Sequence, residues 1–86
     1  MEQILIAEDD EKIAQLEKDY LESSGYGVAI IKEGKKVIPE LMKHDYNLVL
    51  LDIMLPGCSG YEICRQIRNE IDIPILMVTA GRKVWM

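Results

Sequence analysis

Cysteine, histidine and long apolar runs are scarce in this sequence. It has two cysteines, Cys58 and Cys64, and a single histidine. The N-terminus carries no secretory signal, so two cysteines do not indicate a disulfide framework, and we expect free thiols in a reducing cytoplasm. A zinc site is not expected either, because no histidine or further cysteine lies near this pair to complete the ligands.

Basic residues are also few relative to acidic ones. The chain has 10 Lys and Arg residues against 15 Asp and Glu residues, and its net charge is −5. Nucleic-acid phosphates bind to basic surfaces, so a direct nucleic-acid partner is not expected. No apolar run approaches the roughly 20 residues needed to cross a bilayer. These features predict a cytoplasmic protein with no membrane contact.

The chain nevertheless has the composition of a globular domain. Its 86 residues, of which 49% are hydrophobic and 29% charged, suffice for one small domain and not for two. Apolar runs predict strands at 3–7, 26–31, 47–52 and 73–79, and helical periodicity predicts helices at 11–23, 35–44 and 59–69. This βαβαβαβ alternation predicts an α/β fold with a parallel sheet, right-handed crossovers and the strand order 2-1-3-4.

The expected helices are amphipathic. In helix 11–23 the apolar residues that share one face are Ile13, Leu16, Tyr20 and Leu21. In helix 35–44 the residues expected to point inward are Val37, Ile38, Leu41 and Met42. Helix 59–69 is expected to begin with a capping box, in which Ser59 caps the helix and Glu62 follows three residues later.

Acidic residues follow two of the expected strands directly. The apolar run from Leu48 leads into Asp52, and strand 3–7 ends at Glu8 and Asp9. A carboxylate at the end of a buried strand is costly unless it has partners or lies at a solvent-facing edge. In the order 2-1-3-4 these two strands are neighbours, so the three carboxylates should meet at their carboxyl ends, where such sheets bind ligands.

Three converging carboxylates favour a bound cation, because like charges otherwise raise one another's pKa. Carboxylate oxygens suit Mg²⁺ better than a softer metal. Thr79 ends the strand beside Asp52, and a metal, a carboxylate and a hydroxyl are the parts of a phosphoryl-transfer site. Simpler interpretations stay open: Asp52 as a loop acid, Thr79 as a β-branched strand residue, and Asp9 or Asp10 as a helix cap.

Three segments carry a resemblance to a known family. Ile-Leu-Ile-Ala-Glu-Asp-Asp at 4–10, Leu-Leu-Asp-Ile-Met-Leu-Pro-Gly at 50–57 and Pro-Ile-Leu-Met-Val-Thr-Ala at 74–80 resemble the receiver domain of two-component response regulators. The resemblance implies a flavodoxin-like doubly wound sheet. It also implies that Asp52 accepts phosphate from a sensor histidine kinase, that Thr79 is the switch hydroxyl, and that Mg²⁺ is held by Glu8, Asp9, Asp52 and the backbone carbonyl of Met54.

The resemblance extends over residues 1–80, a partial receiver domain, and we expect residues 81–86 to be a tail outside the family pattern. The family continues with a helix, a strand ending in a Lys-Pro pair whose lysine contacts the phosphoryl group, and a last helix. None of these is found in this sequence, so we expect impaired phosphotransfer and switching. The 50–57 segment is similar to regulators that contact DNA through a winged-helix output domain.

A sheet that ends at strand 73–79 would have an apolar edge and one bare face. We therefore predict a homodimer through that face or that edge. The leading function is a phospho-acceptor receiver domain that is not an enzyme. The alternative is a self-associating structural half-domain without phosphotransfer. A Mg²⁺-dependent phosphatase is disfavoured, because Asp52 is followed by Ile53 and Met54 and lacks the Asp-x-Asp motif.

Overall fold

The protein is described by a computed structural model that covers residues 1–53, 55, 59–79 and 82–85. The strands are β1 (Gln3–Ala7), β2 (Gly27–Ile31), β3 (Leu48–Asp52), β4 (Ile75–Thr79) and β5 (Arg82–Trp85). The helices are α1 (Glu11–Ser23), α2 (Val37–Lys43) and α3 (Gly60–Glu70), and a 3₁₀ turn (Gly34–Lys36) precedes α2. The boundaries of α1 are those predicted from the sequence.

The strands form one sheet in the order β2-β1-β3-β4-β5. Strands β1 to β4 are mutually parallel, which confirms the predicted α/β class and the order 2-1-3-4. In the β1–β3 pair, Ala7 is the partner of Leu51. The two strands therefore end at the same level, and the residues after Ala7 lie beside Asp52.

The prediction that β4 is the exposed edge of the sheet was wrong. Strand β5 pairs with β4 in antiparallel orientation, and Arg82 is the partner of Thr79. An unpaired edge strand presents free backbone donors and acceptors, which the following segment satisfies by folding back. Val84 and Trp85 are residue types that favour strands, although we had assigned this segment no secondary structure.

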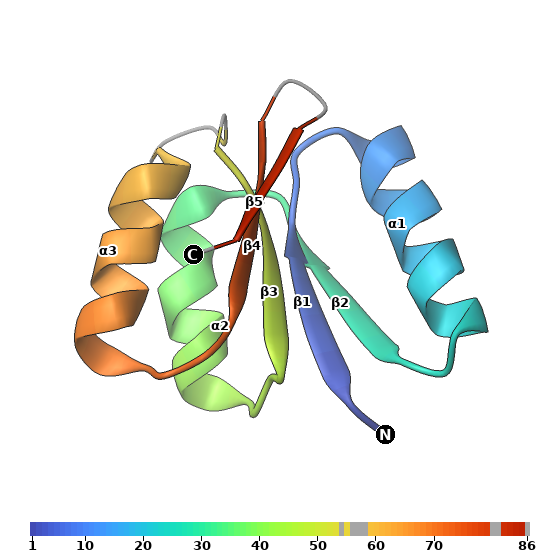
Figure 1. The fold of residues 1–86 in the computed structure, drawn as a ribbon, viewed down its shortest axis with the longest axis horizontal. Coiled ribbons are helices and arrows are strands. Elements are labelled where there is room, and N and C mark those ends of the chain that lie inside the picture. Colours follow the sequence, from blue (N-terminus) through green and yellow to red (C-terminus); the bar gives the residue numbers. More distant parts are fainter. Residues whose placement is uncertain (54, 56–58, 80–81, 86) are drawn as a thin grey trace.

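The two faces of the sheet are covered unequally. Helices α2 and α3 lie together on one face, and α1 lies alone on the other (Figure 1). The α2/α3 face has the larger core, and its fully buried side chains include Leu5, Val37, Val49, Leu51, Ile63, Ile67, Ile75 and Met77. The buried residues of the α1 face are Ile4, Ile6, Ala14, Leu50 and Leu76.

The apolar face predicted for α1 is only partly buried. Leu21 packs against the core of the α1 face, but Ile13, Leu16 and Tyr20 are 45%, 71% and 73% exposed. The predicted apolar stripe is therefore divided, since α1 packs chiefly against β2 and β1 and only its Leu21 side turns toward the core. Ala14 is its one fully buried side chain.

Helix α2 is shorter than predicted and buries fewer residues. Val37 and Leu41 are buried, and Ile38 packs against the same core, as predicted. Met42 is 64% exposed, so its predicted inward position was wrong. Successive residues of a helix are rotated by about 100°, and Met42 follows Leu41 onto the outer side.

The composition predicted free cysteine thiols and no segment long enough to cross a bilayer. Cys64 is buried in the core of the α2/α3 face and is a free thiol, whereas Cys58 lies outside the described residues. Across the part of the chain that the structure describes, no helix combines the length and apolarity required to span a bilayer.

Candidate functional site

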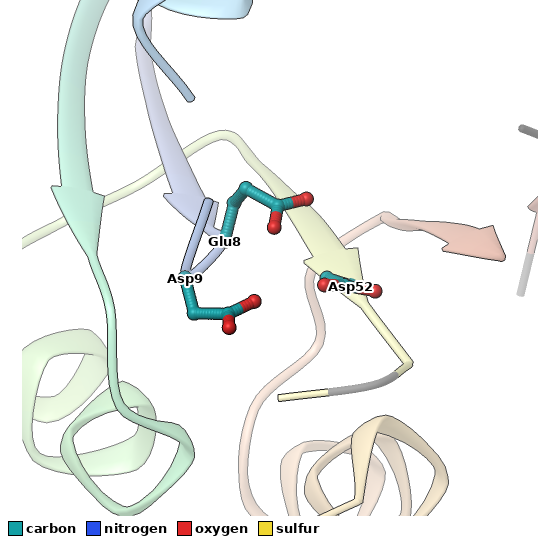
Figure 2. Close-up of side chains that lie close together, drawn as sticks. All are labelled: Glu8, Asp9 and Asp52. Carbon is teal, nitrogen blue, oxygen red and sulfur yellow. The ribbon is translucent and has the colours of Figure 1, made fainter. Parts of the chain in front are cut away.

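Three carboxylates meet at the carboxyl ends of β1 and β3. Glu8 and Asp9 follow β1, and Asp52 is the last residue of β3 (Figure 2). One ligand oxygen from each of these side chains lies within 4.8 Å of the other two. The parallel register of the two strands brings the three side chains together, as the strand order had suggested.

Backbone hydrogen bonds fix the turn that carries Glu8 and Asp9. The Glu8 N–H donates to the carbonyl of Ile31 at 3.0 Å, which holds the turn against the end of β2. The Asp10 N–H donates to Glu8 Oε1 at 3.0 Å. This bond orients the Glu8 carboxylate within the turn.

Asp10, and not Asp9, caps helix α1. Its Oδ1 accepts hydrogen bonds from the N–H groups of Lys12 at 2.9 Å and Ile13 at 3.1 Å. These bonds satisfy backbone donors that have no partner within the helix. The three consecutive acids therefore divide into one cap and two members of the carboxylate cluster.

The end of β3 is held by its neighbours on both sides. The Ile53 N–H donates to the carbonyl of Val78 at 3.2 Å, and the Gly60 N–H donates to the carbonyl of Ile53 at 2.9 Å. A Cβ on Gly60 would lie 2.6 Å from Ile53 Cα and 2.9 Å from the Asp52 carbonyl oxygen. Only glycine lets α3 begin this close to the strand that carries Asp52.

Sequence reasoning missed this supporting role of Gly60, although it had placed the start of a helix there. Ser59 caps α3 by accepting a hydrogen bond from the Glu62 N–H at 3.2 Å, which is one half of the predicted capping box. A helix start directly after a strand end was the available signal. Only the three-dimensional arrangement of the α3 and β3 backbones shows that residue 60 has no room for a Cβ atom.

The buried carboxyl of the cluster has a raised pKa. Burial raises the pKa of Glu8 to about 7, and the charge and hydrogen bonds of Asp52 and Asp9 act in the same direction, against the Asp10 N–H. Glu8 is only 7% exposed. Around pH 7 the Glu8 carboxyl is therefore only partly ionised, and a divalent cation would favour its ionised form.

The donor set fits Mg²⁺. All three groups offer hard oxygen atoms, and their exposure rises from buried Glu8 through half-buried Asp52 to exposed Asp9. Mg²⁺ binds few protein carboxylates and keeps several waters, which a cluster open on one side allows. Met54, whose carbonyl was expected to be a further ligand, lies outside the described residues.

Thr79 lies one residue beyond the position level with Asp52. Asp52 is the partner of Val78 in the β3–β4 pair, and Thr79 follows at the end of β4. Its side chain is outside the described part of the structure, so the switch hydroxyl stays a prediction.

A hollow lies at the opposite ends of the strands. It has a volume of about 300 Å³ and is lined by Gln3, Glu40, His44, Asp45 and Tyr46. Tyr46 donates to Glu40 Oε2 at 2.6 Å, and burial together with this carboxylate raises the pKa of Tyr46 to about 12. This hydrogen bond links α2 to the start of β3. The hollow is separate from the carboxylate cluster, which lies at the other ends of the strands.

Comparison with known proteins identifies the family. The model of the response regulator receiver domain matches residues 4–85. The chain is 48% identical over 77 residues to the transcriptional regulatory protein BaeR of Escherichia coli, a match of 90% of this chain and 32% of BaeR. It is 40% identical over 77 residues to the transcriptional regulatory protein ResD of Bacillus subtilis, again over 90% of this chain and 32% of the relative. The chain thus spans about a third of these curated relatives.

Solved structures agree with this assignment. A chain in the complex of histidine kinase ThkA with response regulator TrrA aligns with a TM-score of 0.87 and 34% identity, over 93% of this chain and 70% of that one. TrrA from Thermotoga maritima in complex with Mg²⁺ and BeF aligns with a TM-score of 0.83 and 31% identity, over 93% of this chain and 72% of that one. The chain belongs to the response regulator receiver domain family.

Proposed function

We propose that Asp52 accepts a phosphoryl group from the phosphohistidine of a sensor histidine kinase, with Mg²⁺ held by Glu8, Asp9 and Asp52. The observation that carries this proposal is the cluster of three carboxylates, with oxygens within 4.8 Å of one another, at the ends of two neighbouring parallel strands. Family membership supports the same role, since TrrA has been solved in complex with Mg²⁺ and BeF and also with a histidine kinase.

The chemistry assigned to Asp52 is nucleophilic. A carboxylate oxygen of Asp52 attacks phosphorus, the P–N bond to the kinase imidazole breaks, and the electron pair of that bond leaves with the imidazole. Mg²⁺, when bound, neutralises charge on the carboxylates and on the phosphoryl oxygens. Glu8 and Asp9 orient the cation beside Asp52, and Glu8 must release its proton for this role.

The proposal includes two groups beyond the described side chains. The carbonyl of Met54 is proposed as a further metal ligand and the Thr79 hydroxyl as the group that binds the phosphoryl oxygens after transfer. Regulation of transcription would require the further length that BaeR and ResD have.

The test is intact-protein mass spectrometry after incubation with phosphoramidate and Mg²⁺. The unmodified chain should gain one phosphoryl group, and D52N should gain none. D72N, which removes an exposed acid far from the cluster, should behave like the unmodified chain. An adduct that persists in D52N, or no adduct on the unmodified chain, would contradict the proposal.

The second candidate is a self-associating module without phosphotransfer. The specific observation in its favour is the exposure of Ile13, Leu16 and Tyr20 on α1. Under this alternative the unmodified chain shows no phosphoryl adduct at any donor concentration and still associates.

A further inference from the structure

The turn that carries two of the three carboxylates lies beside the end of β2. Residues 8–10, here called the acidic turn, connect the end of β1 to the start of α1 (Figure 1). In the β1–β2 pair, Ala7 is the partner of Ile31, so the two strands end level with each other. The acidic turn therefore leaves the sheet next to the residues that follow β2, and contacts with those residues influence where it lies.

Two contacts join the acidic turn to two consecutive residues, Ile31 and Lys32. At the start of the turn, the Glu8 N–H donates to the Ile31 carbonyl at 3.0 Å. Just after the turn, the Lys32 ammonium group donates to the carboxylate of Glu11, the first residue of α1, and forms an ion pair with it. The acidic turn is thus held on both sides by the same short segment, once through the backbone and once through side chains.

Hydrogen bonds within the segment connect these two contacts. The Asp10 N–H donates to Glu8 Oε1 at 3.0 Å, and the Asp10 side chain caps α1. A displacement of the start of α1 would therefore move Asp10 and, through its N–H, the Glu8 carboxylate. The Glu11–Lys32 ion pair opposes this displacement, because it ties the first residue of the helix to the end of β2.

We propose that the Glu11–Lys32 ion pair positions the acidic turn, and with it the two carboxylates that face Asp52. Its effect on Mg²⁺ binding rests on the proposed function, whereas its effect on the position of the turn does not. Lys32 is a positioning residue and not a ligand, because Mg²⁺ binds oxygen atoms and is repelled by an ammonium group.

The expected effect is modest, but its sign distinguishes positioning from simple electrostatics. The side chains of Lys32 and Glu11 are 53% and 76% exposed. Exposed ion pairs contribute little free energy, so we expect changes of about two- to fivefold when the pair is broken. Electrostatics alone predicts that loss of the Lys32 charge tightens the binding of a nearby cation. Positioning predicts instead that the same loss weakens it.

Amide hydrogen exchange, measured by NMR in metal-free buffer, tests the position of the turn directly. K32M and E11A each remove one partner of the pair and should accelerate exchange of the Glu8 amide by about two- to fivefold. The amide of Ile53, at the end of β3, should be unchanged and serves as an internal control. The double variant K32M/E11A should exchange no faster than the single variants, because all three lose the same interaction. K32R, which retains the pair, should match the unmodified chain.

Titration of the same samples with Mg²⁺, followed by the amide shifts of Glu8 and Asp9, tests the consequence for the site. K32M should raise the Kd for Mg²⁺ by about two- to fivefold, and K32R should leave it unchanged. The control is K12A, which removes an exposed positive charge from the first turn of α1 and leaves the Glu11–Lys32 pair intact. It should not raise the Kd. Circular dichroism verifies that each variant is folded.

Three results would overturn the proposal: unchanged Glu8 exchange in K32M, tighter Mg²⁺ binding by K32M, or changes in K32R as large as those in K32M. Absence of Mg²⁺ binding by the unmodified chain would contradict the proposed function and, with it, any effect of the pair on a metal. The exchange rates of the metal-free protein would then decide whether the pair positions the turn.

Discussion

The two faces of the sheet share the same strands but differ in their cover. Adjacent residues of β3 show the difference, since Leu51 on the α2/α3 face is fully buried and Leu50 on the α1 face retains 8% exposure. In β4, Met77 and Leu76 repeat this pattern. Both faces are equally apolar in sequence, so the helices that lie above them determine how much of each becomes core. The α2/α3 face therefore contributes the larger part of the core that stabilises the fold.

Truncation of the two adjacent leucines should give the largest contrast. L51A should lower the free energy of unfolding by about 2–5 kcal/mol, because it leaves a cavity in a fully enclosed core. L50A should lower it by about 1–2 kcal/mol, because Leu50 lines an open groove and water can enter the space that the side chain leaves.

Urea denaturation followed by circular dichroism measures both values. Equal losses for the two variants would remove the distinction between the faces.

The carboxylate cluster lies at the strand ends, where the two faces meet, and it should make stability depend on pH. The pKa of Glu8 in the folded protein is raised from 4.5 to about 7. The folded state therefore holds this proton more tightly than the unfolded state between these values. The stability that Glu8 contributes is fully present below about pH 4.5 and is lost as pH rises through about 7.

The substitution E8Q replaces the titrating Glu8 carboxyl by a neutral amide. In metal-free buffer at pH 8, E8Q should be more stable than the unmodified chain by up to about 3 kcal/mol, and the difference should shrink toward pH 5. Added Mg²⁺ should stabilise the unmodified chain more than E8Q and narrow the gap at pH 8. Thermal melts at several pH values measure this, with the exposed E2Q as the control. An E8Q advantage that stays constant with pH would exclude the raised pKa.

The close approach of α3 to β3 connects the α2/α3 face to the site. G60A places a methyl group 2.6 Å from Ile53 Cα, so the strand end or the helix must shift. We expect a loss of about 1–3 kcal/mol in unfolding free energy and weaker Mg²⁺ binding, since Asp52 moves with the strand end. Q66A, an exposed change on the same helix, is the control for helix propensity. Unchanged stability and Mg²⁺ affinity in G60A would show that this contact does not position the site.

The strand order and the position of the acidic cluster could be predicted from the sequence. Each depends on local patterns, namely apolar runs that end in Asp52 or in Glu8 and Asp9, combined with the regular topology of alternating strands and helices. The exposure of Leu16 could not be predicted in this way, because periodicity identifies an apolar stripe but not the element that covers it. The pairing of β5 with β4 was missed for a related reason, since long-range strand pairing leaves little local signal.

The sequence also could not show whether Asp9 or Asp10 caps helix α1. Both residue types cap helices well, and only the backbone path after β1 shows that Asp10 receives the N–H groups of Lys12 and Ile13. The roles of Met54 and of the Thr79 side chain stay predictions.

The most direct test of the phospho-acceptor assignment is phosphorylation of three matched proteins measured by intact mass. These are the unmodified chain, D52N and D72N, each with phosphoramidate and with or without Mg²⁺. We predict a Mg²⁺-dependent phosphoryl adduct on the unmodified chain and on D72N, and none on D52N. An adduct on D52N, or its absence from both other proteins, would contradict the claim that the strand-end carboxylates form a phospho-acceptor site.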